Sequence, residues 1–158
     1  MNTILKSETL ILDSKAFSIN RMYCKNRNYT TTHYKSWALG ILSLLKQKPN
    51  APRLASLESF FDFNQHRYSI TITTYFPSNI LITKDGYMSS KAFDVSNIEK
   101  PLIDLLFLPK YYLDTPNLNV DDKFISDLSS RKRISSTGEH YIEVKLDVLS
   151  LQDIASEE

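Results

Sequence analysis

Residues 141–148, YIEVKLDV, alternate between apolar and polar side chains without interruption. Successive side chains of a β-strand point to opposite faces of a sheet, so this order predicts a strand with one apolar and one polar face. The apolar positions are Ile142, Val144, Leu146 and Val148, and the polar ones are Tyr141, Glu143, Lys145 and Asp147. The chain is therefore expected to contain a sheet whose two faces differ in polarity.

Several other segments have strand character. Residues 67–76, RYSITITTYF, are rich in β-branched and aromatic side chains and alternate well enough to predict a strand. Residues 8–12 have short strand character, and residues 78–87, SNILITKDGY, look like a short strand that closes on a Lys-Asp-Gly turn. Residues 120–134 are expected to form a strand or a pair of strands.

Two helices are expected between these strands. Residues 30–32 offer N-cap candidates for the first, Pro49 and Pro52 are expected to end it, and a second helix covers residues 97–106. Side chains at helical spacing support the first helix: Trp37, Ile41, Leu44 and Leu45. The interleaved order predicts an α/β or α+β fold, with one small mixed sheet flanked by helices. One domain is expected over residues 1–150, followed by an acidic tail, 151–158.

Length and composition exclude several classes of protein. A chain of 158 residues is long enough for one domain with its own core. Its single cysteine, Cys24, rules out an internal disulfide and favours a reducing compartment. Because no secretory signal and no membrane-spanning run is seen, a cytoplasmic protein without a membrane partner is expected. The three glycines are scattered singly, which excludes a P-loop and a dinucleotide-binding motif.

The net charge of +1 hides a strong asymmetry. Residues 16–57 contain seven basic and no acidic side chains, whereas the rest of the chain has twelve basic and eighteen acidic ones. The basic segment also holds aromatic and imidazole side chains: Tyr23, Tyr29, His33, Tyr34 and Trp37. Such a segment suits a phosphate backbone with nearby bases, and the alternative is a solvated basic face on an ordinary protein.

The segment KAFDVSNIEKPLIDLLF, residues 91–107, crowds polar groups around the start of the second helix. At 100° per residue its apolar side chains share one sector and three polar ones share a second, narrower sector. The apolar sector contains Ile98, Leu102, Leu105 and Leu106, and the polar one contains Asn97, Lys100 and Asp104. Asp94 lies just upstream, so Asp94 and the polar sector are expected to face the same side of the protein.

A purely structural role for these polar groups is the alternative. Ser96 and Glu99 fit a capping box, in which Ser96 is the N-cap. Lys100 and Asp104 could form a surface ion pair across one turn. Pro101 requires the helix to start later than Ser96 or to kink.

A second acidic cluster, Asp121-Asp122, follows in the sequence NVDDKF. Adjacent carboxylates repel each other, so a bound cation stabilises such a pair, although an exposed turn is the common alternative. Carboxylates from two segments, together with a lysine, are what metal-assisted phosphodiester hydrolysis requires.

The spacing Asp-x-x-Asn-x-x-Lys-x-x-x-Asp, present as Asp94, Asn97, Lys100 and Asp104, resembles the central motif of RusA-type Holliday junction resolvases. The later Asp121-Asp122 resembles the Asp-Asp of that family. The segment Asn20-Arg21-Met22-Tyr23 resembles its early loop, and HYIEVKLDV its closing strand. The resemblance covers residues 18–148 in the same order.

The resemblance implies a homodimeric endonuclease, of the kind often encoded by phages and prophages, that uses Mg²⁺ or Mn²⁺ to cut a four-way DNA junction on opposed strands. It would work in the cytoplasm of a bacterial or phage-infected cell. The catalytic residues implied are Asp94, Lys100 and Asp122, and the metal ligands implied are Asp94, Asp121 and Asp122. The DNA contacts expected are Arg21, Tyr23, Lys25, Arg27, Asn97, Arg131, Lys132 and Arg133.

Two departures leave alternatives open. Ser96 stands where family members usually carry a second aspartate, and a hydroxyl is a far weaker Mg²⁺ ligand than a carboxylate. The chain could therefore be a structure-selective DNA-binding protein with weakened or lost turnover. Residues 107–119 also form a longer loop than is usual in the family. A second catalytic hypothesis uses Glu143 and Lys145, which share one strand face as in PD-(D/E)XK nucleases.

Overall fold

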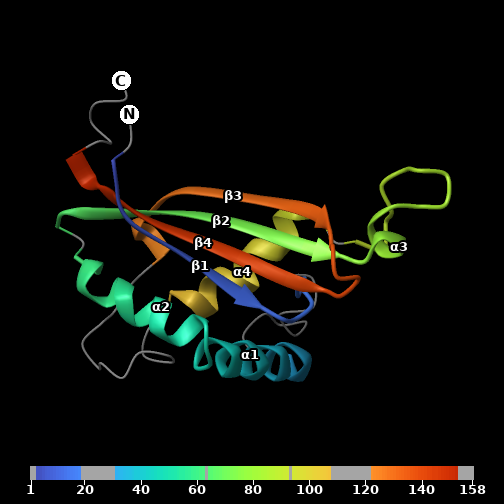
Figure 1. The fold of residues 1–158 in the computed structure, drawn as a ribbon, viewed down its shortest axis with the longest axis horizontal. Coiled ribbons are helices and arrows are strands. Elements are labelled where there is room, and N and C mark those ends of the chain that lie inside the picture. The colour runs from blue at the N-terminus through green and yellow to red at the C-terminus, as the bar shows by residue number, and fades with distance from the viewer. Residues whose placement is uncertain (1–2, 19–30, 63, 93, 108–121, 153–158) are drawn as a thin grey trace.

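The computed structural model describes residues 3–18, 31–62, 64–92, 94–107 and 122–152. In chain order its elements are β1 (Ile4–Leu12), α1 (Thr32–Leu45), α2 (Asn50–Leu57), η2 (Glu58–Phe60), β2 (His66–Phe76), α3 (Ser78–Leu81), α4 (Val95–Leu106), η4 (Asp122–Phe124), β3 (Ile125–Ile134) and β4 (Tyr141–Ser150). The strands form one four-stranded sheet in the order β1-β4-β2-β3 (Figure 1). β4 pairs antiparallel with β1 and β2, whereas β3 pairs parallel with β2. The predicted mixed α+β class is confirmed, and the homodimer stays a prediction.

The strands predicted at residues 67–76 and 141–148 are present, but the segment at residues 78–87 is not a strand. Pro77 follows β2 and has no N–H for a sheet ladder. The chain therefore leaves the sheet, and α3 places Leu81 in the core. A single bridge between Ile82 and Met88 closes the next turn, in which Gly86 has φ +86°. Residues 120–134 contribute one strand, β3, rather than a pair.

Helix α1 begins as its sequence predicts. The Thr31 side chain accepts a hydrogen bond from the Tyr34 N–H at 3.1 Å, which caps the first turn. The helix ends at Leu45, before either proline. Pro52 was expected to break the helix, but it lies in the first turn of α2 instead, where its missing N–H has no helical partner to lose.

Helix α4 begins two residues earlier than expected, with Asp94 as N-cap instead of Ser96. The predicted capping box is therefore wrong. Pro101 lies inside the helix and is buried, and it removes the backbone bond to the Asn97 carbonyl. The helix continues because its apolar sector is fully buried beyond the proline. The Tyr34 hydroxyl also donates to the Pro101 carbonyl at 3.0 Å, which joins α1 to α4.

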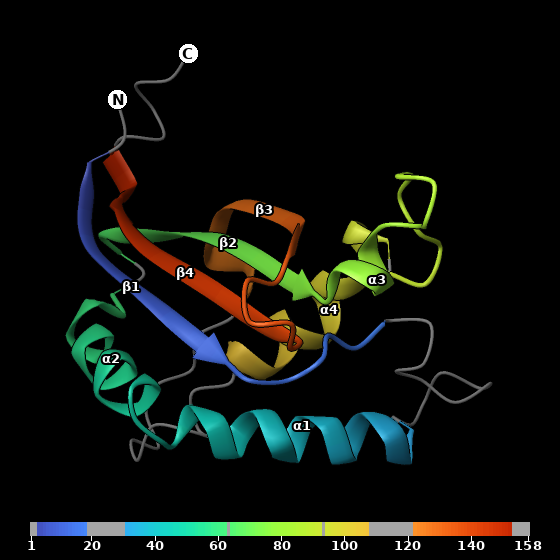
Figure 2. The same cartoon turned by 45° about the vertical axis from the view of Figure 1, so that its right-hand side comes forward.

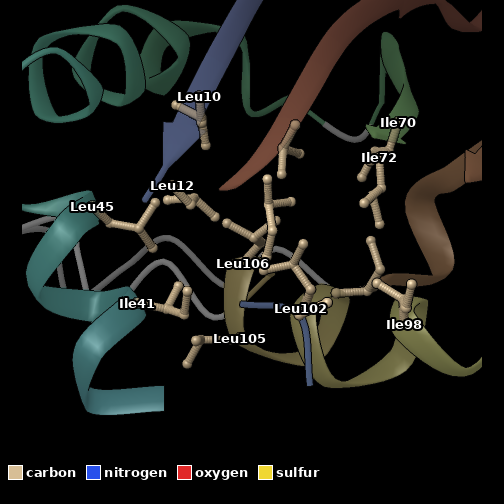
Figure 3. Close-up of a cluster of buried hydrophobic side chains, with 14 of the residues drawn as sticks. Leu10, Leu12, Ile41, Leu45, Ile70, Ile72, Ile98, Leu102, Leu105 and Leu106 are labelled. Atoms are coloured by element: carbon tan, nitrogen blue, oxygen red, sulfur yellow. The ribbon is translucent and has the colours of Figure 1, made fainter. Parts of the chain in front are cut away.

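The core lies between one face of the sheet and the helices α1, α2 and α4 (Figure 2). The alternating apolar side chains of the strands meet the apolar sides of these helices (Figure 3). The fully buried side chains include Leu10, Leu12, Ile41, Leu45, Ile70, Ile72, Ile98, Leu102 and Ile142. The predicted apolar sector of α4 is therefore core, as expected. Among the described residues, no helix is both long and apolar enough to cross a membrane.

The other side of the sheet is polar and is called the open face here. Its side chains come from the alternate positions of β2, β3 and β4: Thr71, Thr73, Tyr75, Asp127, Ser129, Arg131, Arg133, Tyr141, Glu143, Lys145 and Asp147. The Ser129 hydroxyl donates to Thr71 at 3.3 Å, and Arg131 Nε donates to Thr73 at 2.8 Å. These bonds hold β3 side chains against β2, so the open face is an ordered polar surface.

Candidate nucleic-acid interface

Asp94 occupies the N-cap of α4 but does not cap it. Its backbone is extended, with φ −61° and ψ 141°, and its side chain makes no capping hydrogen bond. The residue is exposed to solvent. A negative charge at a helix N-terminus interacts favourably with the helix dipole, and the Asp94 side chain is open to solvent. Asp94 therefore does not play the usual structural role of an N-cap aspartate, which is to accept a hydrogen bond from the first turn of the helix.

The polar sector of α4 follows Asp94 along the helix. Asn97 is half-buried and Lys100 is exposed, one turn further on. The Lys100 ammonium lies 2.9 Å from an oxygen of Asp104, with both side chains partly exposed. This is the ion pair of the structural alternative, and a pair of this kind contributes a few tenths of a kcal/mol to a helix. The pair also keeps a cation on the helix side that carries Asn97.

The start of α4 lies beside the middle of β3. The Ser130 hydroxyl is 3.5 Å from the Val95 carbonyl, and α4 packs along β3 from there. Three basic side chains, called the basic run here, follow directly on the strand: Arg131, Lys132 and Arg133. The fold therefore brings together two groups of predicted site residues that are far apart in the sequence. Lys132 lies on the helix side of β3, whereas Arg131 and Arg133 are exposed on the open face.

The second predicted carboxylate lies at the other end of α4. Asp122 begins η4, which leads into β3, and Ile125 pairs with Tyr68 at the start of β2. The Tyr68 ring in turn packs against the ring of Phe107, directly after α4, with centroids 6.4 Å apart. A helix of 12 residues is about 18 Å long. One chain therefore places the backbone of Asp122 at the opposite end of α4 from Asp94.

The metal site predicted from the sequence stays a prediction, because most of its side chains are not among those that the structure describes. Asp121 and the side chain of Asp122 lie outside the described residues. Among the side chains that are described, no three from His, Cys, Asp and Glu lie close enough together to hold a metal ion. The predicted DNA contacts Arg21, Tyr23, Lys25 and Arg27 also fall outside the described residues.

The open face contains an aromatic pair that the sequence did not reveal. The rings of Tyr75 and Tyr141 are stacked, with centroids 4.2 Å apart and an interplanar angle of 9°. The Tyr75 hydroxyl donates to Glu143 at 3.2 Å. Burial, followed by the Glu143 carboxylate, raises the pKa of Tyr75, so this hydroxyl remains a donor at neutral pH. Alternation places Tyr141 on the polar face, but only the β2–β4 register brings it opposite Tyr75.

The Glu143 and Lys145 side chains do share the open face, as alternation predicts. Glu143 accepts the bond from Tyr75, and the Lys145 ammonium lies 3.9 Å from Asp147. Helix α4 packs on the opposite side of the sheet, so Asp94 is not the acidic partner that a PD-(D/E)XK site needs. Strands β2 and β4 therefore provide a polar surface on which Tyr75 bonds to Glu143. The carboxylates of α4 do not lie on this surface.

Chemically, the best-equipped region is the half of the sheet that contains the C-terminal ends of β2 and β3, beside which α4 begins. Asp94, at the start of α4, and Lys132 of β3 lie on the helix side of the sheet, whereas Arg131, Arg133 and the stacked tyrosines lie on the open face. Basic side chains bind phosphates, and carboxylate oxygens are the ligands preferred by Mg²⁺. In comparisons with models of known protein families and with curated proteins, the sequence has no significant match.

Proposed function

We propose that this protein is a Mg²⁺-dependent endodeoxyribonuclease that cuts four-way DNA junctions as a homodimer. The observation that carries the proposal is the exposed carboxylate of Asp94 at the start of α4, which packs against β3, the strand that carries the basic run. Cationic side chains bind a phosphodiester backbone, and its metal-assisted hydrolysis needs carboxylates that hold the metal ion. The RusA-like spacing from Asp94 to Asp104 adds the lysine expected near the scissile phosphate.

A dimer is part of the proposal because Asp94 and Asp122 are too far apart within one chain. Two copies related by a two-fold axis can place the start of α4 in one copy near η4 in the other. Two equivalent sites then form, and each takes one carboxylate segment from each copy. A symmetric dimer with two such sites suits a junction with two opposed strands to cut.

Cleavage of a synthetic four-way junction tests this function. With Mg²⁺ or Mn²⁺, the protein should introduce nicks at symmetric positions in two opposed strands, and chelation of the metal should stop the reaction. A linear duplex with the sequence of one junction arm is the matched control, and it should stay intact at the same protein concentration. Equal cutting of the duplex and the junction, or metal-independent cutting, would contradict the proposal.

A binding protein without turnover is the second candidate, because Ser96 offers a hydroxyl where a carboxylate is expected. Ser96 is exposed in the first turn of α4, close to Asp94 in sequence. If the protein binds junctions tightly but yields no product, the Ser96→Asp variant decides between the candidates. If Ser96→Asp gains cleavage activity, the missing carboxylate at position 96 explains the loss of turnover in the wild-type protein. An inactive Ser96→Asp variant would leave only the binding role.

Replacing Arg131 or Arg133 with alanine should weaken junction binding and lower its salt dependence. Because the substitution is present in both copies of the dimer, two arginine–phosphate interactions are lost, and the slope of log affinity against log salt should fall by about 2. The change should be similar for the junction and for duplex DNA, because interactions with phosphates do not read shape or sequence. Fluorescence anisotropy at several salt concentrations measures this slope.

The matched control for both arginines is Lys6→Ala. Lys6 lies on β1 at the far edge of the sheet, where its ammonium is 3.4 Å from Glu8. This substitution removes the same charge and should leave the slope unchanged. An equal fall in slope for Lys6→Ala and Arg131→Ala would show that DNA is attracted by the positive charges of the protein in general, and not by a defined surface that contains the arginines.

A further inference from the structure

The edge strand β3 has an outer side that no described element covers. It forms one edge of the sheet, and no described helix or strand lies beyond it (Figures 1 and 2). None of its ten side chains is buried. Two large apolar side chains are exposed on it, Leu128 by 42% and Ile134 by 50%. An open edge presents unpaired N–H and C=O groups, which are a template for another strand.

The charges along β3 favour a second copy of the same strand, running in the opposite direction. Asp127 lies near the start of β3, where its carboxylate pairs with the buried Arg67 at 2.7 Å but stays 52% exposed, and Arg131 and Arg133 lie near the end of the strand on the same face. Parallel pairing in register would place equal charges opposite each other. Antiparallel pairing places the acidic start of one strand opposite the basic end of the other, and opposite charges stabilise such cross-strand pairs.

One register fits these charges and the symmetry. A two-fold axis perpendicular to the sheet keeps the open faces of both copies on the same side, so only residues of the same face can lie opposite each other. With the axis at Ser129, Asp127 of each copy lies opposite Arg131 of the other. Leu128 then lies opposite Ser130 and is covered by the neighbouring strand.

We infer that two copies of the chain pair through β3 in antiparallel fashion, with Ser129 on the two-fold axis. The two four-stranded sheets would become one continuous sheet. As the arrangement of the nuclease dimer, this inference rests on the proposed function. It also places η4 of the second copy at the C-terminal end of β3 in the first copy, and the middle of that strand lies beside the start of α4.

A disulfide trap at Ser129 tests the pairing directly. The Ser129→Cys variant, in a Cys24→Ser background, should form a disulfide-linked dimer on mild oxidation, because opposite residues of antiparallel strands have Cα atoms about 4.5–5.5 Å apart, within disulfide range. Ser126→Cys is the matched control: it is on the same strand and exposed, but it lies three residues from the axis, so its two copies are too far apart to be linked. It should remain unlinked at the same concentration.

Sedimentation velocity on uncrosslinked protein provides the second measurement. The wild-type protein should be a dimer, and Ser129→Asp, which places two carboxylates together at the axis, should shift it towards monomer while the circular dichroism spectrum stays native. A monomeric wild-type protein, or a disulfide at Ser126 and none at Ser129, would overturn the inference. If the protein forms the Ser129-linked dimer but cuts no junction, the proposed nuclease function is contradicted and the β3 interface is supported. If it cuts junctions but forms no Ser129-linked dimer, the β3 interface is contradicted and the nuclease function is supported.

Discussion

The Asp94→Asn variant should cut four-way junctions about 100- to 1000-fold more slowly than the wild-type protein, a loss of the size seen when one preorganised electrostatic group, such as an oxyanion-hole donor, is removed from an active site. The amide has nearly the same size as the carboxylate, and the carboxylate makes no capping hydrogen bond. The helix therefore keeps its start, and what is removed is the charge. Single-turnover cleavage rates at saturating protein measure the effect on the chemical step.

Junction binding and stability separate this effect from damage to the fold. Asp94→Asn should bind the junction at least as tightly as the wild-type protein does, because the substitution removes a negative charge near the phosphates. Its free energy of unfolding should fall by no more than about 1 kcal/mol, the value of a charge at a helix N-terminus. Glu99→Gln, one turn further along α4, is the matched control and should cut at close to the wild-type rate. A fast Asp94→Asn variant would remove Asp94 from the site.

The sequence was sufficient for the parts of the fold that rest on local patterns. The alternation of residues 141–148 predicts β4 and its two faces, because one period describes the whole strand. Thr31 predicts the start of α1 through its side-chain oxygen. The predicted start of α4 is wrong because Ser96 and Asp94 are both residue types favoured at an N-cap, so the local sequence does not show which of them precedes the helix.

The arrangement of the candidate site depends on pairings that no local pattern contains. β3 lies parallel to β2, so the connection through α4 returns the chain to the end of the sheet at which β2 begins. This crossover places η4 and the N-terminus of α4 at opposite ends of the helix. The spacing between Asp94 and Asp122 in the sequence carries no such information. The stacking of Tyr75 on Tyr141 likewise follows from the register of β2 and β4 alone.

If each site takes Asp94 from one copy and Asp122 from the other, two inactive variants should restore cleavage when their subunits are exchanged. Asp94→Asn and Asp122→Asn homodimers each have no intact site. Half of the dimers in an equimolar mixture are mixed, and each mixed dimer has one intact site out of two. The mixture should therefore recover about a quarter of the wild-type sites. Sites confined to one chain would recover none, since every chain carries one of the two substitutions.

A supercoiled plasmid that extrudes a cruciform distinguishes these cases by the form of its product. The wild-type dimer, with two active sites, should cut both opposed strands and release linear DNA. The mixed dimer has one active site, so it should release nicked circles and very little linear DNA. Each variant incubated alone under the same exchange conditions is the control and should leave the plasmid supercoiled. Linear product from the mixture, or no nicking after subunit exchange has been verified, would contradict a site shared between two copies.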